Sequence, residues 1–369
     1  MRLPTVGRSE VLRWYRRVRR VAPKPREDRQ RTPRLVAAPV PYAGDLLEVE
    51  DLHTHFHTAR GTVRAVDGVS LSVAQGRTLG IVGESGSGKT VLARSIMGLL
   101  TARSVERTGS VKFEGRELLD LPGPELRGLW GTEMAMVFQD PMTSLNPVMR
   151  IGQQLTEGVR YHLKVPKAAA RQLAVKLLTD VGIPDPARRL RRYPHELSGG
   201  MRQRVTIAIA LAAGPKLLLA DEPTTALDVT VQAQILDLLQ QQQRERFMAM
   251  VLVTHDLGVV AGRTDEIIVM YAGQVVERAP TATLFAKVKM PYTEALLASI
   301  PSLTAPSHER LKVIGGRPPD LINPPSGCRF APRCPYVQAR CTAEAPPLME
   351  ASPGHHYRCW FPIADPVVR

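Results

Sequence analysis

GESGSGKT, at residues Gly83–Thr90, is the stretch of sequence that decides the fold. It matches the phosphate-binding pattern G-x-x-x-x-G-K-[ST]. The apolar run Thr78–Val82 before it predicts a buried strand, and Val91–Leu100 after it predicts a helix. A strand, a glycine-rich loop and a helix in this order predict an α/β fold with a phosphate-binding loop at the end of a strand.

Each position of the loop has a predicted role. Glycines let the backbone curl so tightly that its N–H groups point at phosphate oxygens, where the helix N-terminus adds its positive end. Lys89 is expected to reach the β- and γ-phosphates of ATP, and the Thr90 hydroxyl to bind Mg²⁺. The nucleotide-binding residues predicted in the loop are Gly83, Ser85, Gly86, Ser87, Gly88, Lys89 and Thr90.

Two carboxylates end a second apolar run, LLLADE at Leu217–Glu222. We expect Asp221 to bind the nucleotide's Mg²⁺, and Glu222 to polarise the water that attacks the γ-phosphate. Two adjacent acids after a strand are also typical of a helix N-cap. The catalytic interpretation therefore depends on the other motifs around it.

Two more polar residues follow apolar runs. His255 comes after Met250–Thr254, at the carboxyl end of a predicted parallel strand, where open α/β sheets bind ligands. We expect it to contact the γ-phosphate. Gln139 comes after Met136–Phe138 and is expected to sense Mg²⁺ and the attacking water. A structural histidine and an ordinary loop glutamine are the alternatives for these two residues.

A further motif, LSGGMRQR at Leu197–Arg204, completes an ordered set. Its other members are the phosphate-binding loop, Gln139, Asp221, Glu222, the trio Ala226, Leu227 and Asp228, and His255. In order and spacing this set resembles the nucleotide-binding subunit of an ABC transporter, over about residues 46 to 300. The resemblance implies ATP hydrolysis by a RecA-like P-loop NTPase core, with an antiparallel β subdomain and a helical subdomain at about residues 145–205.

The resemblance also implies that ATP lies between two subunits. The signature residues would cap ATP held by the second subunit, because a serine and glycines before a helix offer free N–H groups to a γ-phosphate. Asp228 would contact the opposing subunit, ATP binding would close the pair, and hydrolysis would open it. The signature residues are Ser198, Gly199, Gly200 and Met201.

The adenine-stacking residue is less well defined. Family members stack adenine on an aromatic residue before the loop, and Phe56 in the sequence HTHFH is the candidate. The insertion Thr58–Thr62 makes the alignment with family members ambiguous here. Val63 or a histidine is therefore an alternative adenine-stacking residue. A purely structural Phe56 is a third interpretation.

Charge is concentrated at the start of the chain. The 369 residues carry a net charge of +14, and residues 1–44 hold 12 Arg or Lys against 3 acidic residues. This extension is expected to be largely disordered. A short basic helix at Val11–Val18 on anionic lipid, a tail without a defined role, and a start codon assigned too far upstream are its three interpretations. The chain shows neither a membrane-spanning apolar run nor a signal peptide.

All four cysteines, Cys328, Cys334, Cys341 and Cys359, lie in the last 42 residues. Four thiolates suit an iron–sulfur cluster or tetrahedral zinc, and free structural cysteines are the third possibility. A cytosolic location disfavours disulfides. The stretch Pro324–Pro335 resembles the C-terminal extension of the ATPase subunits of dipeptide and oligopeptide importers, some of which hold a four-iron cluster there.

Within that importer group, Val137–Pro147 and Leu219–Gln234 resemble the D-type ATPase subunit. The resemblance implies a peripheral ATPase on the cytoplasmic face of the cell membrane. Its implied partners are a second ABC ATPase subunit (an F-type relative or a second copy), two transmembrane permeases, and an extracytoplasmic peptide-binding protein. The expected domains are residues 1–44, 45–300, and a C-terminal extension at 301–369.

Two other functions stay open at this point. Similar importers carry nickel or another small solute. Soluble ABC-type ATPases act on nucleic acid, but those of translation fuse two nucleotide-binding domains and those that organise DNA insert long coiled coils. This chain has one phosphate-binding loop and no sustained heptads, so no specific nucleic acid is expected as a partner.

Overall fold

The computed structural model describes residues 42–225, 227–300 and 314–364. The predictions for the basic N-terminal helix and for the proline-containing segment after it lie outside these ranges. Ala226 of the predicted trio and the first part of the expected C-terminal extension, residues 301–313, also lie outside them.

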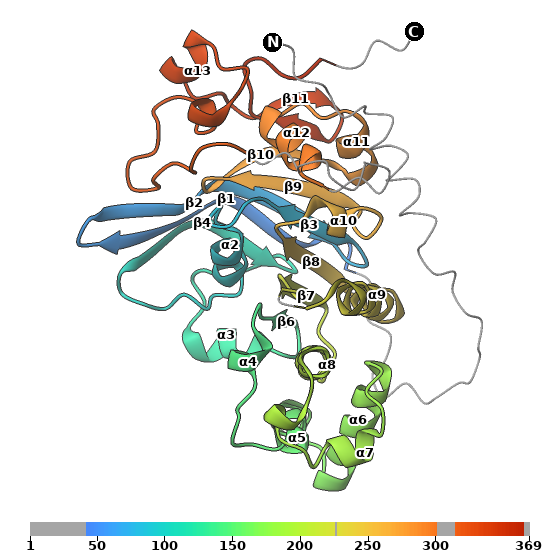
Figure 1. The fold of residues 1–369 in the computed structure, drawn as a ribbon. Coiled ribbons are helices and arrows are strands. Elements are labelled where there is room, and N and C mark those ends of the chain that lie inside the picture. The colour runs from blue at the N-terminus through green and yellow to red at the C-terminus, as the bar shows by residue number, and fades with distance from the viewer. Residues whose placement is uncertain (1–41, 226, 301–313, 365–369) are drawn as a thin grey trace.

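A large sheet forms the centre of the molecule (Figure 1). Its strand order is β11-β12-β10-β9-β3-β8-β7-β6, and the five strands from β9 to β6 run parallel. Every residue of β3, β7 and β8 is buried, as is typical of parallel strands covered on both faces. The strands are β3 (Thr78–Val82), β6 (Met134–Val137), β7 (Leu217–Asp221), β8 (Ala249–Thr254), β9 (Glu266–Tyr271), β10 (Gln274–Pro280), β11 (Met349–Ser352) and β12 (His355–Tyr357).

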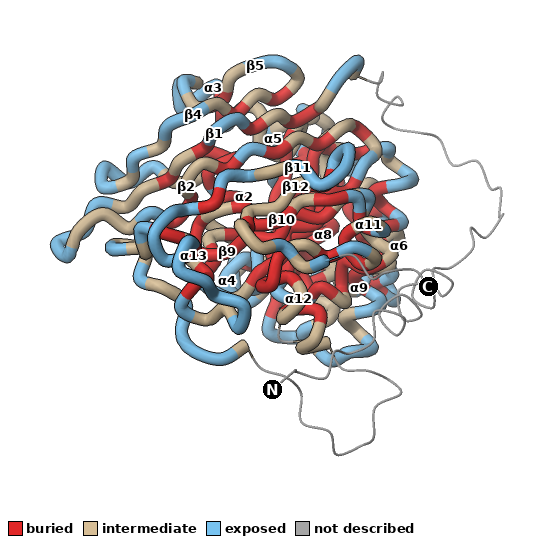
Figure 2. The backbone as a smooth tube through the Cα atoms, turned by 90° about the horizontal axis from the view of Figure 1, so that it is seen from above, coloured by how far each residue is buried: buried red, intermediate tan, exposed pale blue. Residues whose placement is uncertain are grey.

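A second, antiparallel sheet packs against one face of this sheet. Its order is β2-β1-β4-β5, formed by β1 (Asp45–Thr58), β2 (Gly61–Ala74), β4 (Val105–Phe113) and β5 (Arg116–Glu117). Strand alternation divides the central strands between two cores. Leu219 and Val251 join the core under the antiparallel sheet and α2 (Lys89–Ile96), whereas Leu218 and Leu252 join the core shared with the helices. Figure 2 shows these buried residues gathered at the centre.

The helices complete the architecture. Helices α5, α6 and α7 lie together at the end of the molecule farthest from α13, and α8 packs on α5 and α6 (Figure 1). The remaining helical bounds are α3 (Gly123–Leu129), α4 (Pro141–Ser144), α5 (Ile151–Leu163), α6 (Lys167–Asp180), α7 (Pro186–Arg189), η1 (Pro194–Glu196), α8 (Gly199–Ala210), α9 (Val229–Arg246), α10 (Leu257–Val260), α11 (Thr281–Ala286), α12 (Pro291–Ala298), η2 (Ala331–Arg333) and α13 (Ala339–Ala343).

Helix α2 differs from its prediction at both ends. Val91–Leu100 was expected, but the helix begins at Lys89 and ends at Ile96. It begins early because the last residues of the phosphate-binding loop already form its first turn. It ends early because Met97 caps it and Gly98 follows with a left-handed φ of 66°.

Two strands near the end of the described chain, β11 and β12, are part of the central sheet. β12 pairs with β10, and β11 pairs with β12. In the ranges that the structure describes, no helix combines the length and apolar character needed to cross a membrane.

Candidate active site

The phosphate-binding loop has a geometry that only glycine tolerates at two positions. A Cβ on Gly83 would lie 2.2 Å from the Met270 carbonyl oxygen, and a Cβ on Gly88 would lie 2.2 Å from that of Ala65. Gly88 also has a left-handed φ of 100°. Neighbouring backbone therefore fixes the tight curl of the loop.

Lys89 lies inside this loop and is almost fully buried. Its Nζ donates to the carbonyl oxygens of Gly83, at 2.7 Å, and Glu84, at 3.0 Å. Burial lowers the pKa of the Lys89 ammonium, while the charges of Glu222 and Asp221 oppose this shift. The ammonium is thus directed across the loop, as a phosphate-binding lysine requires.

The two predicted metal ligands face each other. Thr90 Oγ1 donates to Asp221 Oδ1 at 3.0 Å, joining the first turn of α2 to the end of β7. Asp221 Oδ2 is buried and has no hydrogen-bond partner among the described residues. Burial raises the pKa of Asp221, although its bond from Thr90 opposes the shift. A buried carboxylate oxygen without a partner beside a threonine hydroxyl fits a cation site.

Glu222 is the centre of a second group of polar side chains. Its Oε2 accepts from Gln139 Nε2 at 3.0 Å and from Thr225 Oγ1 at 2.9 Å, and lies 3.2 Å from His255 Nδ1. Its Oε1 lies 3.9 Å from Lys89 Nζ. The structure thus brings together Glu222, Gln139 and His255, whose roles were predicted from three separate segments.

The charges of this group stabilise one another. The hydrogen bond from His255, followed by that from Thr225, lowers the pKa of Glu222 against the effect of burial. The same contact with Glu222 raises the pKa of His255. Glu222 is consequently held as a carboxylate, the form that polarises water. Thr225 was missed from the sequence because a threonine two residues after Pro223 carries no signal of its own.

The signature residues occupy the start of α8. Ser198 is its N-cap, with Oγ accepting from Met201 N at 3.3 Å. Gly200 packs closely on α9, because a Cβ there would lie 2.8 Å from Val231 Cγ1. Within the described ranges, no hydrogen bond or ion pair joins Ser198, Gly199, Gly200 or Met201 to the chain's own phosphate-binding loop.

Asp228 and Phe56 have local contacts that leave their predicted roles open. Asp228 is the N-cap of α9, and its Oδ1 accepts from Val231 N at 2.9 Å. Phe56 is partly buried in β1, between Val63 of β2 and Val105 of β4. Strand alternation places Phe56 on the face where Thr54 bonds Ser95 of α2. The contact of Asp228 with a second subunit and the stacking of adenine on Phe56 stay predictions.

Comparison with known families agrees with this site. A family model described as "ABC transporter" matches residues 66–225, and one described as "Oligopeptide/dipeptide transporter, C-terminal region" matches residues 276–341. The chain is 50% identical over 320 residues to the dipeptide transport ATP-binding protein DppD of Escherichia coli K12, covering 87% of this chain and 98% of that relative. It belongs to the ABC transporter ATP-binding proteins.

Other relatives and structures point the same way. The oligopeptide transport ATP-binding protein OppD of Bacillus subtilis 168 is 49% identical over 317 residues, 86% of this chain and 88% of that protein. A dimeric ATP-binding cassette, MJ0796 in a post-hydrolysis state with ADP and Pi, superposes with a TM-score of 0.58 at 27% identity, over 64% of this chain and 98% of the cassette. The predicted P-loop NTPase fold and the ABC ATPase family are thereby confirmed.

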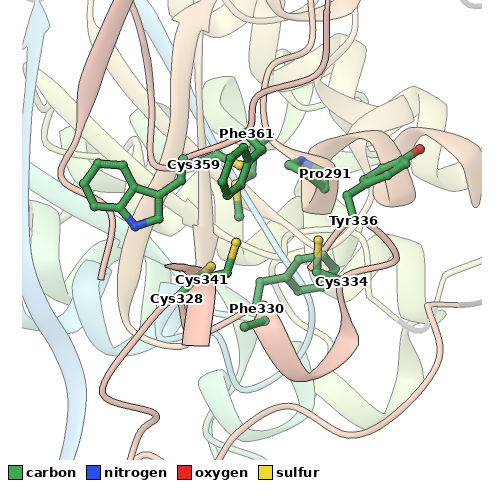
Figure 3. Close-up of a pocket in the computed structure, with 11 residues that line it drawn as sticks. Pro291, Cys328, Phe330, Cys334, Tyr336, Cys341, Cys359 and Phe361 are labelled. Atoms are coloured by element: carbon green, nitrogen blue, oxygen red, sulfur yellow. The ribbon is translucent and has the colours of Figure 1, made fainter. Parts of the chain in front are cut away.

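The family model of the C-terminal region covers Cys328, Cys334 and Cys341. These residues and Cys359 line one pocket, with Cys328 beside Cys341 and Cys334 toward Tyr336 (Figure 3). Burial raises the pKa of Cys334 to about 11 and that of Cys359 to about 12. No three of the four sulfurs lie within 4.8 Å of one another.

No pattern in the sequence predicted how this region contacts the phosphate-binding loop. Glu84, inside GESGSGKT, forms a two-pronged ion pair with Arg333, with Nη1–Oε2 at 2.6 Å and Nη2–Oε1 at 2.9 Å. Tyr292 Oη accepts from the Glu84 N–H at 2.8 Å. The cysteine-containing region is therefore in direct contact with the phosphate-binding loop.

Proposed function

We propose that this ABC ATPase powers the uptake of dipeptides or oligopeptides through ATP-driven closure of a dimer of ATP-binding subunits. The observation that carries the proposal is the Glu222 cluster, because it joins a base, a glutamine and a histidine beside Lys89 and Asp221. The peptide substrate rests on the names of relatives that are about half identical over most of the chain.

Each residue has a distinct part in hydrolysis. Glu222, held ionised by His255, orients the attacking water and accepts its proton as the bond to the γ-phosphorus forms, while the bond to the β–γ bridging oxygen breaks and ADP leaves. Lys89 and the loop N–H groups stabilise the charge that builds up on the phosphoryl oxygens. Gln139, bonded to Glu222, positions both the carboxylate and the water. Thr90 and Asp221 would hold Mg²⁺, which supplies positive charge at the β- and γ-phosphates when bound.

The signature residues act across the dimer in this proposal. Ser198 caps α8, so the free N–H groups of Gly199 and Gly200 lie at the positive end of a 12-residue helix. These groups would complete the site of a second ABC subunit, either an F-type relative or a second copy. Asp228 would couple the two sites at the same interface.

The remaining partners follow from the same assignment. Two permease chains and an extracytoplasmic peptide-binding protein would supply the pore and the choice of solute, with this chain on the cytoplasmic side of the membrane. The segment Asp140–Pro147 is a candidate docking surface, because Met142 is 61% exposed. Nickel and other small solutes are the competing substrates.

A metal centre at the cysteines is part of the proposal. Tetrahedral zinc, with Zn–S bonds of about 2.3 Å, holds its sulfurs about 3.8 Å apart, and no three of the cysteines here form so compact a group. The four cysteines line one pocket, and we propose a four-iron cluster there, with Cys328, Cys334, Cys341 and Cys359 as ligands and a structural role. Metal and sulfide analysis of anaerobically purified protein, with its visible spectrum, tests this. Absence of iron and sulfide would contradict it.

Glu222→Gln tests the main proposal in the chain co-assembled with its permeases in liposomes. ATP should still bind, whereas ATPase turnover should fall about 10²- to 10⁴-fold, because the water loses its base. Dipeptide and oligopeptide uptake should stop in parallel. Near-normal turnover would contradict the role of Glu222. Uptake of nickel but not of peptide by the unaltered transporter would overturn the substrate and leave the ATPase mechanism intact.

A further inference from the structure

Two histidines and a carboxylate lie together on the antiparallel sheet, and the two histidines lie on the face of β1 opposite to Phe56. His53 and His55 are two residues apart in β1 and share one face of the strand, and Asp67 lies on the neighbouring strand β2. One donor atom of each lies within 4.8 Å of the other two. None of the three has a part in the mechanism described above.

The distances match a tetrahedral metal site. Asp67 Oδ1 lies 3.1 Å from His53 Nδ1 and 3.5 Å from His55 Nε2. Zinc binds imidazole nitrogen and carboxylate oxygen at about 2.0–2.2 Å, so two tetrahedral ligand atoms lie about 3.3–3.5 Å apart. The two measured separations are close to this value. The three donors can therefore meet at one cation without rebuilding the strands.

The hydrogen bonding around these side chains leaves a place for a cation. A carboxylate only accepts hydrogen bonds. Each His53 nitrogen that faces a carboxylate must therefore carry a proton or bind a metal. His53 Nε2 lies 3.2 Å from Asp51 Oδ1 and can donate there, which leaves Nδ1 to bind a cation. His55 Nε2 is buried and forms no hydrogen bond with any described residue. Hydrogen bonds can explain the His53 contacts, whereas His55 Nε2 has only its 3.5 Å approach to Asp67 Oδ1.

The outer contacts are those of known metal sites. A ligating histidine usually donates its other N–H to a carboxylate, as His53 can to Asp51. A ligating carboxylate is itself hydrogen-bonded, and Arg329 pairs with Asp67 Oδ2, leaving Oδ1 for the cation. The side chains of His53, His55 and Asp67 are 29%, 22% and 14% exposed, so the group lies near the surface, although His55 Nε2 itself is buried.

We propose that His53, His55 and Asp67 bind one divalent transition-metal cation of the zinc class. Two imidazoles and one carboxylate suit Zn²⁺, Co²⁺ or Ni²⁺ better than Mg²⁺. Water would take the fourth position. Bound there, the cation would fasten β1 to β2 beside Arg329, one residue through which the cysteine-containing region contacts this sheet.

Zinc titration of the full chain by calorimetry tests the proposal, after its metal content has been measured. The unaltered chain should take up about one added equivalent of Zn²⁺. His55→Asn should weaken this binding at least about tenfold, because loss of even an outer contact costs about 10- to 100-fold. Asp51→Asn should weaken it less. His57→Asn is the matched control, since His57 shares the strand face but contacts Thr62 and Glu106.

The cysteines are the competing zinc ligands, and a cysteine variant separates the two sites. Zinc binding that Cys334→Ser abolishes but His55→Asn leaves unchanged would overturn the proposal. Equal loss in His55→Asn and His57→Asn would do so as well. Thermal unfolding of each variant without added zinc shows whether it is folded, and Asp67→Asn provides a second test should His55→Asn fail to fold.

Discussion

Lys89 is expected to act mainly in one step of the ATPase cycle, the binding of ATP. Its two hydrogen bonds end on loop carbonyl oxygens, and its ammonium lies 3.9 Å from Glu222. Lys89→Ala should weaken ATP binding about 10- to 100-fold, because a charge-assisted hydrogen bond contributes about 1.5–3 kcal/mol. Equilibrium binding of a fluorescent ATP analogue measures this. Lys112→Ala, which alters an exposed lysine near Glu50, should bind normally.

His255 predicts a pH dependence of stability. Its folded-state pKa is raised by Glu222, so the contact adds stability below the ordinary histidine pKa of about 6.5 and loses it as pH rises through the raised value. The pKa of Glu222 is lowered, so the stability that its ionised carboxylate contributes is lost only as pH falls through that lowered pKa. His255→Gln should therefore unfold at lower temperature than the unaltered chain near about pH 6, and equally near about pH 9.

The size of this effect is limited by solvent. His255 is more than half exposed, and exposed ion pairs contribute only about 0.2–1 kcal/mol. Calorimetric scans of the nucleotide-free chain at several pH values measure the difference. A difference that grew with pH would contradict the assignment of the raised pKa to His255.

At the scale of elements, the join between β10 and β12 depends on one buried carboxylate. Glu277 is fully buried and accepts from the N–H groups of Lys289 and Met290, at 2.7 and 3.1 Å, and lies 2.9 Å from His355 Nε2. It thus ties the central sheet to the segment before α12 and to the C-terminal strand. Its removal would take one buried hydrogen-bond acceptor away from all three partners.

Glu277→Ala should accordingly lower the free energy of unfolding by about 3–5 kcal/mol, because each buried group that loses its hydrogen-bond acceptor costs about 1–3 kcal/mol. Chemical denaturation followed by circular dichroism measures the loss. Glu350→Ala is the control, since Glu350 lies on the surface at 4.0 Å from His356. A loss below about 1 kcal/mol would show that the hydrogen bonds of Glu277 do not stabilise the pairing of β10 with β12.

How much the sequence could predict differs between elements. Strands β3, β7 and β8 were predicted because a short apolar run followed by a motif residue is a local signal. The limits of α2 were not, because its first turn belongs to a loop shaped by contacts with Ala65 and Met270 in other strands. The hydrogen bonds from Thr225 to Glu222 and from Thr90 to Asp221 Oδ1 likewise depend on how the folded segments pack together. The residue types and their spacing predicted which side chains form the site. The hydrogen bonds among these side chains depend on the folded structure and could not be predicted.

At the scale of the whole molecule, residues distant in sequence meet at the phosphate-binding loop. Glu84 and Arg333 are 249 residues apart, so no local pattern could predict their ion pair. The Arg333 side chain is only 3% exposed and also donates to the Gly315 carbonyl oxygen at 2.8 Å. The adjacent residue is Cys334, which lines the cysteine pocket. The C-terminal region is thereby connected to the loop that contains Lys89.

This connection predicts that Arg333 affects ATP binding and hydrolysis, although Arg333 is not among the residues expected to contact ATP. Arg333→Met should raise the KM for ATP and lower kcat/KM about tenfold or more, because a displaced Glu84 moves the carbonyl oxygen to which Lys89 donates. Steady-state ATPase assays on the assembled transporter measure both constants. Arg340→Met is the matched control, since Arg340 lies in the same region but pairs with exposed Glu344 and stacks on Trp360.

The double variant Glu84→Gln with Arg333→Met separates positioning from general destabilisation. If Arg333 acts by orienting Glu84, the two changes should cost little more together than the larger one alone, because contacting residues are not additive. A purely structural Arg333 predicts that the losses multiply in kcat/KM. Thermal unfolding of the same variants shows whether stability follows the kinetics. Additive losses, with unfolding temperatures falling in step, would reject coupling between the cysteine-containing region and ATP binding.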